Sequence, residues 1–355
     1  MRAARIHRFG PPETLRVDDI PVPTPGPGEA LVRIHACGVN RMDTELRAGV
    51  YGGEPLANFF FGRDLVLPHI LGIEPAGVVV SATDGGLTPG TRVVPHSHLA
   101  CGRCAQCIAG FDNACPQIRV LGVQTPGQGG YAEYFTWPSA RLLPFAETLE
   151  FTTAAALLVN YGPVWFGLVE RAGLRPGDTL LVTGASGGCG HAALDIGRLF
   201  GARTIAVTRA RDKTAALTEA GADEVVIDEG DQRWAEAVAE LTGGRGADCV
   251  VELVGAATWT QSVRACAIRG CIVVIGSHTG LAVDLNLGEV FGKNLAIHGI
   301  TRANQAAMAR MLRLAERGRL RPVVTERIPL ERAADAHRLL ESGRHTGKLV
   351  LTMPD

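Results

Sequence analysis

Three things are missing from this sequence, and each absence excludes a class of protein. The charges balance, with 35 Lys plus Arg against 36 Asp plus Glu, so no net field would hold nucleic acid or an anionic membrane surface. No apolar run reaches about 18 residues, and no cationic start leads into an apolar core and a cleavage site. We therefore expect a cytoplasmic protein that has neither nucleic-acid nor membrane partners.

The composition is that of a folded chain of about two domains. Hydrophobic residues make up 46% and charged residues 20%, which excludes disorder, and 355 residues exceed the roughly 100 to 200 of one domain. Up to about residue 150, short β-like runs are broken by Gly and Pro, which predicts a barrel or sandwich of strands with long loops. The expected strands are 30–35, 73–81, 92–95 and 130–136.

From about Thr152 the pattern changes. Short Val- and Ile-rich runs alternate with helical segments of about 10 to 15 residues, which predicts parallel βαβ units covered by helices on both faces. The expected strands are 179–183, 203–208, 224–227, 248–254, 271–276 and 295–300. Beyond a helix at 305–317, a helix at 330–342 lies between two further strands, the last at 348–352. We expect this tail to pack on the first domain.

Four of the nine cysteines, Cys101, Cys104, Cys107 and Cys115, fall within 15 residues. In a chain expected in the cytoplasm, such crowding favours a metal over disulfides. Four thiolates make the closed tetrahedral shell that structural zinc prefers and leave no open position for water or substrate. We expect one structural Zn²⁺ per chain that stabilises a lobe and does no chemistry, with an iron–sulfur cluster as the alternative.

A glycine-rich segment, Gly184-Ala-Ser-Gly-Gly-Cys-Gly190, lies between the expected strand 179–183 and an expected helix at 191–200. Glycines let backbone N–H groups approach a pyrophosphate, and the helix turns its positive N-terminal end toward it. With a second strand about 20 residues on, this placement predicts a dinucleotide site; the alternative is a turn without a ligand. The expected cofactor contacts are Ser186, Gly187, Gly188, Cys189 and Gly190.

The end of the second strand indicates which dinucleotide binds. An NAD site has an Asp or Glu there for the ribose 2′-OH, whereas this chain has Thr208-Arg209-Ala-Arg211-Asp-Lys213. Arginine can hold a 2′-phosphate with two hydrogen bonds. Arg209 and Lys213 therefore favour NADPH, although surface arginines are common in this sequence.

These pieces, in this order, resemble the medium-chain dehydrogenase/reductase superfamily over essentially the whole chain. The resemblance rests on the Cys101 to Cys115 lobe, Leu71-Gly-Ile-Glu-Pro-Ala-Gly77, Gly129-Gly-Tyr-Ala-Glu-Tyr134, the Gly184 to Gly190 loop and Gly347-Lys348-Leu-Val-Leu. It implies an α/β protein with a GroES-like β-barrel catalytic domain, residues 1–155 completed by 300–355, and a Rossmann domain with a doubly wound parallel sheet, residues 156–299. It also implies cofactor contacts from Gly276, Ser277 and Lys348, and a homodimer or homotetramer that pairs sheet edges near 295–300.

Zinc alcohol dehydrogenases of this superfamily hold a second, catalytic zinc through a Cys, the His of a Gly-His-Glu motif and a later Cys or Glu. The matching positions here are Asn40, Ile73 in Gly72-Ile-Glu74, and Val159 or Asn160, which make no usable ligand set. Cys37 is three residues off this register and is more simply a buried thiol. Alkoxide chemistry without that zinc loses its main electrophile. Hydride addition to a carbonyl-conjugated C=C bond needs less stabilisation of negative charge, because a few hydrogen-bond donors can stabilise an enolate.

The segment from Val39 through Asn40 and Asp43 to Tyr51 resembles the quinone oxidoreductases and enoyl reductases. This resemblance implies an NADPH-dependent reductase of activated C=C bonds in enones, quinones or enoyl thioesters, acting on a small, apolar, carbonyl-containing substrate. Asn40 is the expected donor to the substrate oxygen and Tyr51 the proton source or a second donor. Asp43 is expected to orient the loop or a cofactor hydroxyl, and Asn160 to line the pocket near the nicotinamide.

Two other functions stay open on the sequence. One is a zinc-independent, NADPH-dependent carbonyl or imine reductase, and the other is a non-catalytic NADPH-binding protein.

The run Phe59-Phe60-Phe61 predicts either an apolar cover for a pocket mouth or a local hydrophobic plug.

Overall fold

A computed structural model describes residues 1–59, 65–96 and 98–354, and the chain divides into two compact units. Unit 1 comprises Met1–Val159, Asn304–Gly318 and Val324–Asp355, and unit 2 comprises Asn160–Ala303 and Arg319–Val323. The C-terminal tail therefore completes the unit that the N-terminal residues begin.

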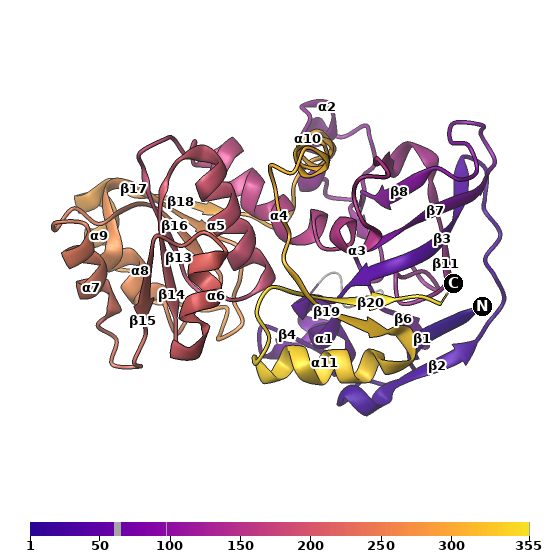
Figure 1. The fold of residues 1–355 in the computed structure, drawn as a ribbon, viewed down its shortest axis with the longest axis horizontal. Helices are drawn as coiled ribbons and strands as arrows, with labels where there is room; N and C mark the ends of the chain where they lie inside the picture. The colour runs from indigo at the N-terminus through magenta and orange to yellow at the C-terminus, as the bar shows by residue number, and fades with distance from the viewer. Residues whose placement is uncertain (60–64, 97, 355) are drawn as a thin grey trace. The chain divides into compact units, whose positions relative to one another are not determined.

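Unit 2 is built on a six-stranded parallel sheet in the order β15-β14-β13-β16-β17-β18. Figure 1 shows α5 and α6 on one side of this sheet and α7, α8 and α9 on the other. Because helices cover both faces, all four residues of the central strand β13 are buried, and the predicted doubly wound sheet is confirmed. The elements are α4 (Leu158–Trp165, which begins in unit 1), β13 (Thr179–Val182), α5 (Gly188–Phe200), β14 (Arg203–Thr208), α6 (Thr214–Glu219), β15 (Glu224–Ile227), α7 (Trp234–Leu241), β16 (Ala247–Glu252), α8 (Trp259–Ala265), β17 (Cys266–Val274), α9 (Leu287–Lys293) and β18 (Ala296–Gly299).

Unit 1 is built on a mainly antiparallel seven-stranded sheet in the order β12-β8-β7-β3-β20-β19, with β11 also paired to β3. The inward residues of the long strand β3 alternate with half-buried ones, and Val32 and Ile34 pack in a core with Phe135 and Trp137. The strands are β1 (Arg2–Ile6), β2 (Leu15–Asp19), β3 (Glu29–Gly38), β4 (Val50–Tyr51), β5 (Glu54–Pro55), β6 (His69–Ile70), β7 (Pro75–Ala82), β8 (Arg92–Pro95), β9 (His98–Leu99), β10 (Arg119–Val120), β11 (Tyr134–Pro138), β12 (Leu142–Pro144), β19 (Val324–Pro329) and β20 (Lys348–Thr352). The helices are α1 (Arg41–Ala48), α2 (Ala105–Ile108), α3 (Phe151–Ala154), α10 (Gln305–Glu316) and α11 (Ala333–Ser342).

Several element ends differ from the sequence prediction. Strand β17 begins at Cys266 instead of residue 271, because a bulge with Arg269 at φ +63° lets the chain pair with β16 before and after it. Strand β11 begins four residues later than expected. Helix α5 begins three residues earlier, because Gly187 caps it, and α11 follows a separate 3₁₀ turn.

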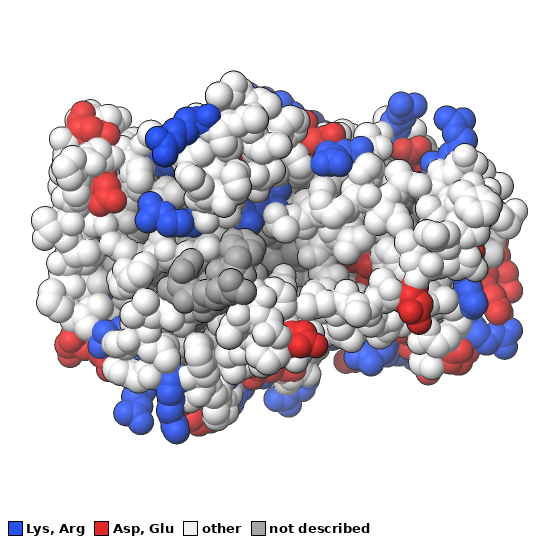
Figure 2. All heavy atoms as spheres, turned by 180° about the vertical axis from the view of Figure 1, so that it is seen from behind, with Lys and Arg blue, Asp and Glu red and all other residues white. Residues whose placement is uncertain are grey.

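The surface mixes both signs of charge. Figure 2 shows Lys and Arg side chains interspersed with Asp and Glu over the face drawn, in keeping with the net charge of −1. Across the described residues, every helix is too short or too polar to span a bilayer.

Candidate active site and metal centre

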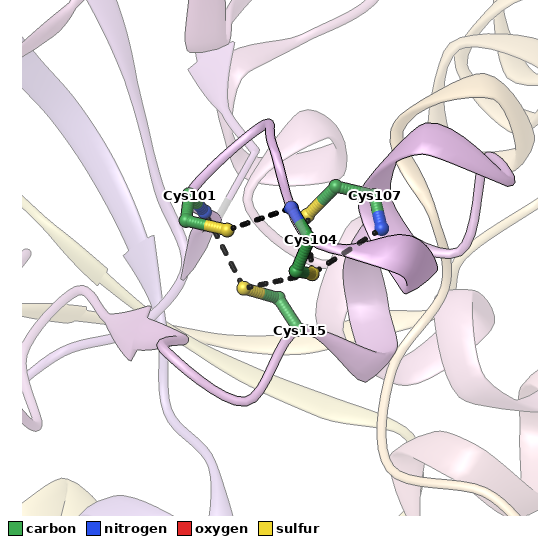
Figure 3. A group of neighbouring side chains, drawn as sticks. All are labelled: Cys101, Cys104, Cys107 and Cys115. Carbon is green, nitrogen blue, oxygen red and sulfur yellow. Dashed lines mark hydrogen bonds between the residues drawn. The ribbon is translucent and has the colours of Figure 1, made fainter.

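The four clustered cysteines converge in unit 1, in the loop that carries the short helix α2 (Figure 3). The Cys104 Sγ atom lies 3.5 Å from the Cys107 Sγ and 4.0 Å from the Cys115 Sγ, and all four sulfurs lie within 4.8 Å of one another. Sulfurs placed tetrahedrally at about 2.3 Å from a zinc ion stand about 3.8 Å apart. The spacing therefore fits a four-thiolate metal centre.

Backbone N–H groups support three of these sulfurs, those of Cys101, Cys104 and Cys115, as thiolates. The amide of Cys101 donates to the Cys115 Sγ at 3.3 Å, that of Cys104 to the Cys101 Sγ at 3.3 Å, and that of Cys107 to the Cys104 Sγ at 3.5 Å. The amide of Gln117 adds a further bond of 3.4 Å to Cys115. Hydrogen bonds to the charged form of a group favour that form, which a metal-bound thiolate requires.

A second group of candidate ligands, His96, His98 and Asp112, lies beside this lobe. Arg141 Nη1 stands 2.6 Å from Asp112 Oδ2 and 3.1 Å from His96 Nδ1. A guanidinium cation therefore already neutralises the carboxylate, and the group anchors the lobe. The other Asp112 oxygen accepts from the backbone amide of Gln305 at 3.2 Å, which ties the lobe to α10.

Three buried polar side chains meet elsewhere in unit 1. Lys348 Nζ lies 2.8 Å from Glu74 Oε2 and 2.5 Å from Asn40 Oδ1. Asn40 Nδ2 donates to Glu74 Oε2 and to the Gly38 carbonyl, both at 3.3 Å. Asn40, Glu74 and Lys348 are 7%, 4% and 5% exposed. This group, the Asn40–Glu74–Lys348 cluster, is a buried ion pair with a carboxamide bound to both of its charges.

The sheet register places these residues together. Strand β20 runs antiparallel to β3 with Val350 opposite Gly38, and continuing this register sets position 348 across from position 40. Gly38 is required at this point, because a Cβ there would lie 2.2 Å from the Ala155 carbonyl oxygen and 2.5 Å from Glu74 Oε2. The cluster is therefore closely packed on the backbone side.

The residues of this cluster do not fit a catalytic zinc. Ile73 is buried in the core of unit 1 and offers no ligand atom. Glu74 is already neutralised by Lys348 through one oxygen, and its other oxygen accepts from the Val159 amide at 2.8 Å. A second cation beside Glu74 would be repelled by the ammonium group, and the Asn40 carboxamide oxygen, the other possible ligand atom of the cluster, is held by Lys348.

Asp43 fixes the start of α1 through hydrogen bonds to the backbone. Its carboxylate accepts from the backbone amide of Asn40 at 2.9 Å and from that of Gly72 at 3.1 Å. Burial raises the pKa of Asp43 to about 7. The Tyr131 hydroxyl donates to Asp43 at 3.4 Å and contacts His337 Nε2 at 3.1 Å. Burial lowers the pKa of His337 to about 3, so this ring is neutral.

Sequence reasoning missed most of this network. Tyr131 lies in the Gly129 to Tyr134 motif, which assigns it no role, and Glu74 lies in the Leu71 to Gly77 motif without a predicted partner. No sequence signal marks His337. The resemblance implies a cofactor contact for Lys348, which stays a prediction, and gives no sign that its ammonium group binds Glu74 and Asn40.

The other expected catalytic residues lie in different surroundings. Tyr51 is half-buried in β4, and its ring meets the Phe59 ring edge-on at 5.0 Å. Phe60 and Phe61 lie outside the described residues. Asn160 belongs to unit 2, where Cys189 Sγ donates to its Oδ1 at 3.6 Å. The structure thus joins Asn40 and Asp43 to the cluster and places Asn160 at the glycine-rich loop.

The glycine-rich loop has the shape of a phosphate cradle. Gly187 caps α5, and a Cβ on it would meet nothing nearer than 3.8 Å, so space is open at the helix N-terminus. Gly188 and Gly190 are packed instead, since a Cβ would lie 2.6 Å from Asn160 Oδ1 and 2.3 Å from the Ala185 carbonyl oxygen. The first-turn amides of this 13-residue helix have no intrahelical acceptor and suit a pyrophosphate.

Most of the remaining expected cofactor residues follow the carboxyl ends of strands of the parallel sheet, where such sheets bind nucleotides. Gly276 and Ser277 follow β17, and a Cβ on Gly276 would lie 2.0 Å from the Leu253 carbonyl oxygen. Arg209 follows β14 and is exposed. Lys213 is largely buried, and burial lowers its pKa. This arrangement fits a dinucleotide and leaves an exposed guanidinium beside the expected ribose position.

Comparisons with known proteins agree with the superfamily that the sequence resembles. The alcohol dehydrogenase GroES-like domain family matches residues 26–147, and the zinc-binding dehydrogenase family matches residues 220–351. The NAD-dependent alcohol dehydrogenase of Sulfurisphaera tokodaii is 32% identical over 99% of each chain, and the quinone oxidoreductase of Homo sapiens is 28% identical over 99% of this chain and 98% of its own. A crystal structure of an NAD-dependent alcohol dehydrogenase is 41% identical, covers 100% of both chains and has a TM-score of 0.92. The chain is therefore an oxidoreductase that belongs to the medium-chain dehydrogenase/reductase superfamily.

Proposed function

We propose that the protein is an NADPH-dependent reductase of C=C bonds conjugated to a carbonyl group, as in enones, quinones or enoyl thioesters. The observation that carries this proposal is the Asn40–Glu74–Lys348 cluster. The resemblance to zinc alcohol dehydrogenases matches Asn40 and Ile73 to positions of catalytic-zinc ligands. This cluster offers an amide and an ammonium group, and its three members include no thiolate or imidazole.

This donor set suits an enolate better than an alkoxide. Hydride addition to the β-carbon moves the π electrons toward the carbonyl and spreads the negative charge over carbon and oxygen. A positioned hydrogen-bond donor in a dry site contributes about 3 to 4 kcal/mol to such a transition state. Asn40 is the proposed donor to the carbonyl oxygen. Tyr51 is the proposed proton source, since a phenol is neutral at pH 7 and can donate.

NADPH is the proposed cofactor and supplies the hydride when bound. The loop residues Ser186 to Gly190 would hold its pyrophosphate, and Arg209 its 2′-phosphate. The strand β14 ends at Thr208, and Arg209 follows it at the place where an NAD site uses an acidic residue. Two relatives named above are called NAD-dependent, so the preference has to be measured on this chain.

The four-cysteine lobe is proposed to hold one structural zinc ion per chain. The sulfur spacing and the four N–H···S bonds support this assignment over disulfides. The closed ligand set would stabilise the lobe without taking part in hydride transfer.

A homodimer is proposed through the edge strand β18, which ends the six-stranded sheet. The helix before it exposes Leu287 by 67% and Phe291 by 75%, and Ile297 on the strand is 38% exposed. An open strand edge flanked by large apolar side chains is a surface that a second copy would cover. A tetramer built from two such dimers is compatible with this edge.

A second candidate is reduction of a carbonyl or imine without zinc. The names of the alcohol dehydrogenase relatives favour it. In this reaction Asn40 would polarise a C=O bond, or a protonated iminium would need no metal.

The decisive test is NADPH oxidation at 340 nm with a panel of enones, quinones, an enoyl thioester, saturated ketones and cyclic imines. We expect turnover of the conjugated C=C substrates, with the saturated product identified by mass spectrometry. Turnover confined to saturated ketones or imines would replace the proposal with the second candidate. Repeating the assay after dialysis against a chelator, with zinc measured in the same sample, separates a loss of fold from a loss of chemistry.

A further inference from the structure

Lys348 is one of only three lysines in the chain, and its ammonium group is buried in an ion pair with Glu74. Two of its three N–H bonds have acceptors among the described residues, Glu74 Oε2 and Asn40 Oδ1. The second contact is 2.5 Å long, at the short end for a charge-assisted hydrogen bond. The proposed function so far assigns this lysine no part in the reaction.

We infer that Lys348 is a positioning residue that fixes the orientation of the Asn40 carboxamide, so that Asn40 can offer only its N–H end to a substrate oxygen. This inference rests on the proposed function. A carboxamide has an accepting and a donating end that differ little in shape. The Asn40 oxygen is bound by the ammonium group, and its NH₂ group faces the Glu74 carboxylate and the Gly38 carbonyl.

Rotation of the amide by 180° is costly in this cluster. It would set the Asn40 NH₂ group against the Lys348 ammonium group and the carbonyl oxygen against the Glu74 carboxylate, so two attractive contacts would become two repulsive ones. All three side chains are more than nine-tenths buried, so water screens these contacts little.

The donating end is held less tightly than the accepting end. Both Asn40 Nδ2 contacts are 3.3 Å long, beyond the usual range for a strong N–H···O bond. An enolate oxygen, which carries developing negative charge, is a better acceptor than the Gly38 carbonyl and can replace it. A flipped amide would present a carbonyl oxygen to that charge and oppose the reaction.

Lys348 also neutralises the negative charge of Glu74, which would otherwise repel the charge that develops on the substrate oxygen. Without Lys348, the Glu74 carboxylate would stand as an uncompensated buried charge next to Asn40. Any substrate oxygen bound to Asn40 would then gain negative charge close to another one. The ion pair removes this repulsion, so Lys348 acts on the substrate through Asn40 and Glu74.

The test uses the full-length, zinc-loaded protein and the variant Lys348→Met combined with Glu74→Gln, which removes the ion pair without leaving a buried charge. We expect kcat for a conjugated substrate to fall about 10- to 100-fold, the effect of losing a charge-assisted hydrogen bond, while the Kd of NADPH changes less than about twofold. The single variant Lys348→Arg keeps a donor cation beside Glu74 and should therefore retain most of the wild-type kcat. Arg327→Met is the matched control. Arg327 lies on β19, the strand next to β20, and its substitution removes the cation of an exposed ion pair with Glu150.

Two measurements separate positioning from other roles. In an Asn40→Ala background the same double substitution should cause no further loss of kcat, because its effect passes through Asn40. Binding of substituted phenols as enolate mimics, measured with NADP⁺ present, should tighten with phenol acidity in the wild type and lose this trend in the variant.

The outcomes are distinct. Unchanged kcat, or a fall in NADPH affinity with kcat preserved at saturation, would overturn the inference and return Lys348 to a cofactor contact. If the wild type reduces no conjugated C=C bond, the proposed function fails. In that case the phenol series still decides whether Lys348 orients Asn40, because it needs no turnover.

Discussion

The buried carboxyl group of Asp43 makes the stability of unit 1 depend on pH in a way that one substitution can remove. The side chain is fully buried beneath Asn40, and burial raises its pKa from an ordinary value of 3.8 to about 7. We therefore predict that Asp43→Asn alters the pH profile of unfolding, beyond any constant loss from its hydrogen bonds to the Asn40 and Gly72 amides.

The sign and size follow from proton linkage. Between about pH 4 and pH 7 the folded state keeps a proton on Asp43 that the unfolded state has lost, so raising the pH in this window favours unfolding. The loss of stability is at most about 1.4 kcal/mol per pH unit, amounts to about 4 kcal/mol in total and stops above about pH 7. Asp43→Asn cannot titrate and should lack this slope.

The measurement is the urea-induced unfolding of the wild type and the variant from pH 5 to pH 8, with zinc present. We expect the difference between their unfolding free energies to change by about 2 kcal/mol between pH 5 and pH 7 and to level off by about pH 8. Asp84→Asn serves as the control, because the Gly86 amide lowers the pKa of this exposed carboxyl, which therefore stays ionised throughout the range. Parallel curves for wild type and Asp43→Asn would refute the reasoning and show that hydrogen bonds keep Asp43 ionised.

Three further predictions concern the proposed cofactor, metal and dimer. Arg209→Ala should raise the KM for NADPH about 10- to 100-fold and leave that for NADH nearly unchanged in steady-state kinetics; equal effects would contradict the 2′-phosphate assignment. Cys101→Ser should lower the zinc content from one ion per chain to near zero by elemental analysis and lower Tm, whereas two ions in the wild type would restore a catalytic metal. Phe291→Glu should halve the mass measured by light scattering at micromolar concentration, and an unchanged mass would place the interface elsewhere.

Much of the fold could be predicted because its signals are local. The strands β14, β15, β8 and β20 begin and end where the sequence placed them, since each is a short Val- or Ile-rich run with polar or glycine residues beside it. The cysteine group and the glycine-rich loop are also local, with all ligands or loop amides within 15 residues. Spacing alone is informative for such sites.

The polar network of unit 1 could not be predicted in this way. Lys348 and Asn40 are 308 positions apart, and Tyr131 and His337 are 206 apart. They meet only because β20 pairs with β3 and α11 packs on the same core, and no local pattern encodes that register. Lys348 thus had one visible feature, its place in Gly347-Lys348-Leu-Val-Leu, and this suggested a different partner.

The surroundings of Asn40 show how a chain of this superfamily can hold a polar side chain rigidly at a position that elsewhere holds a metal ligand. Asp43 binds its backbone amide, so the start of α1 cannot shift, while Lys348 binds its side-chain oxygen, so the amide cannot rotate. The two contacts come from different elements of unit 1, a carboxyl group in the first turn of α1 and an ammonium group on the first residue of β20. A metal ion fixes its ligands and supplies positive charge in one step, whereas here the fixing is shared by two side chains and the charge is largely cancelled by Glu74. The dispersed charge of an enolate needs less stabilisation than the localised charge of an alkoxide, so a nearly neutral, rigid donor of this kind can suffice for the enolate without a metal, and under the proposed function this difference favours conjugated substrates.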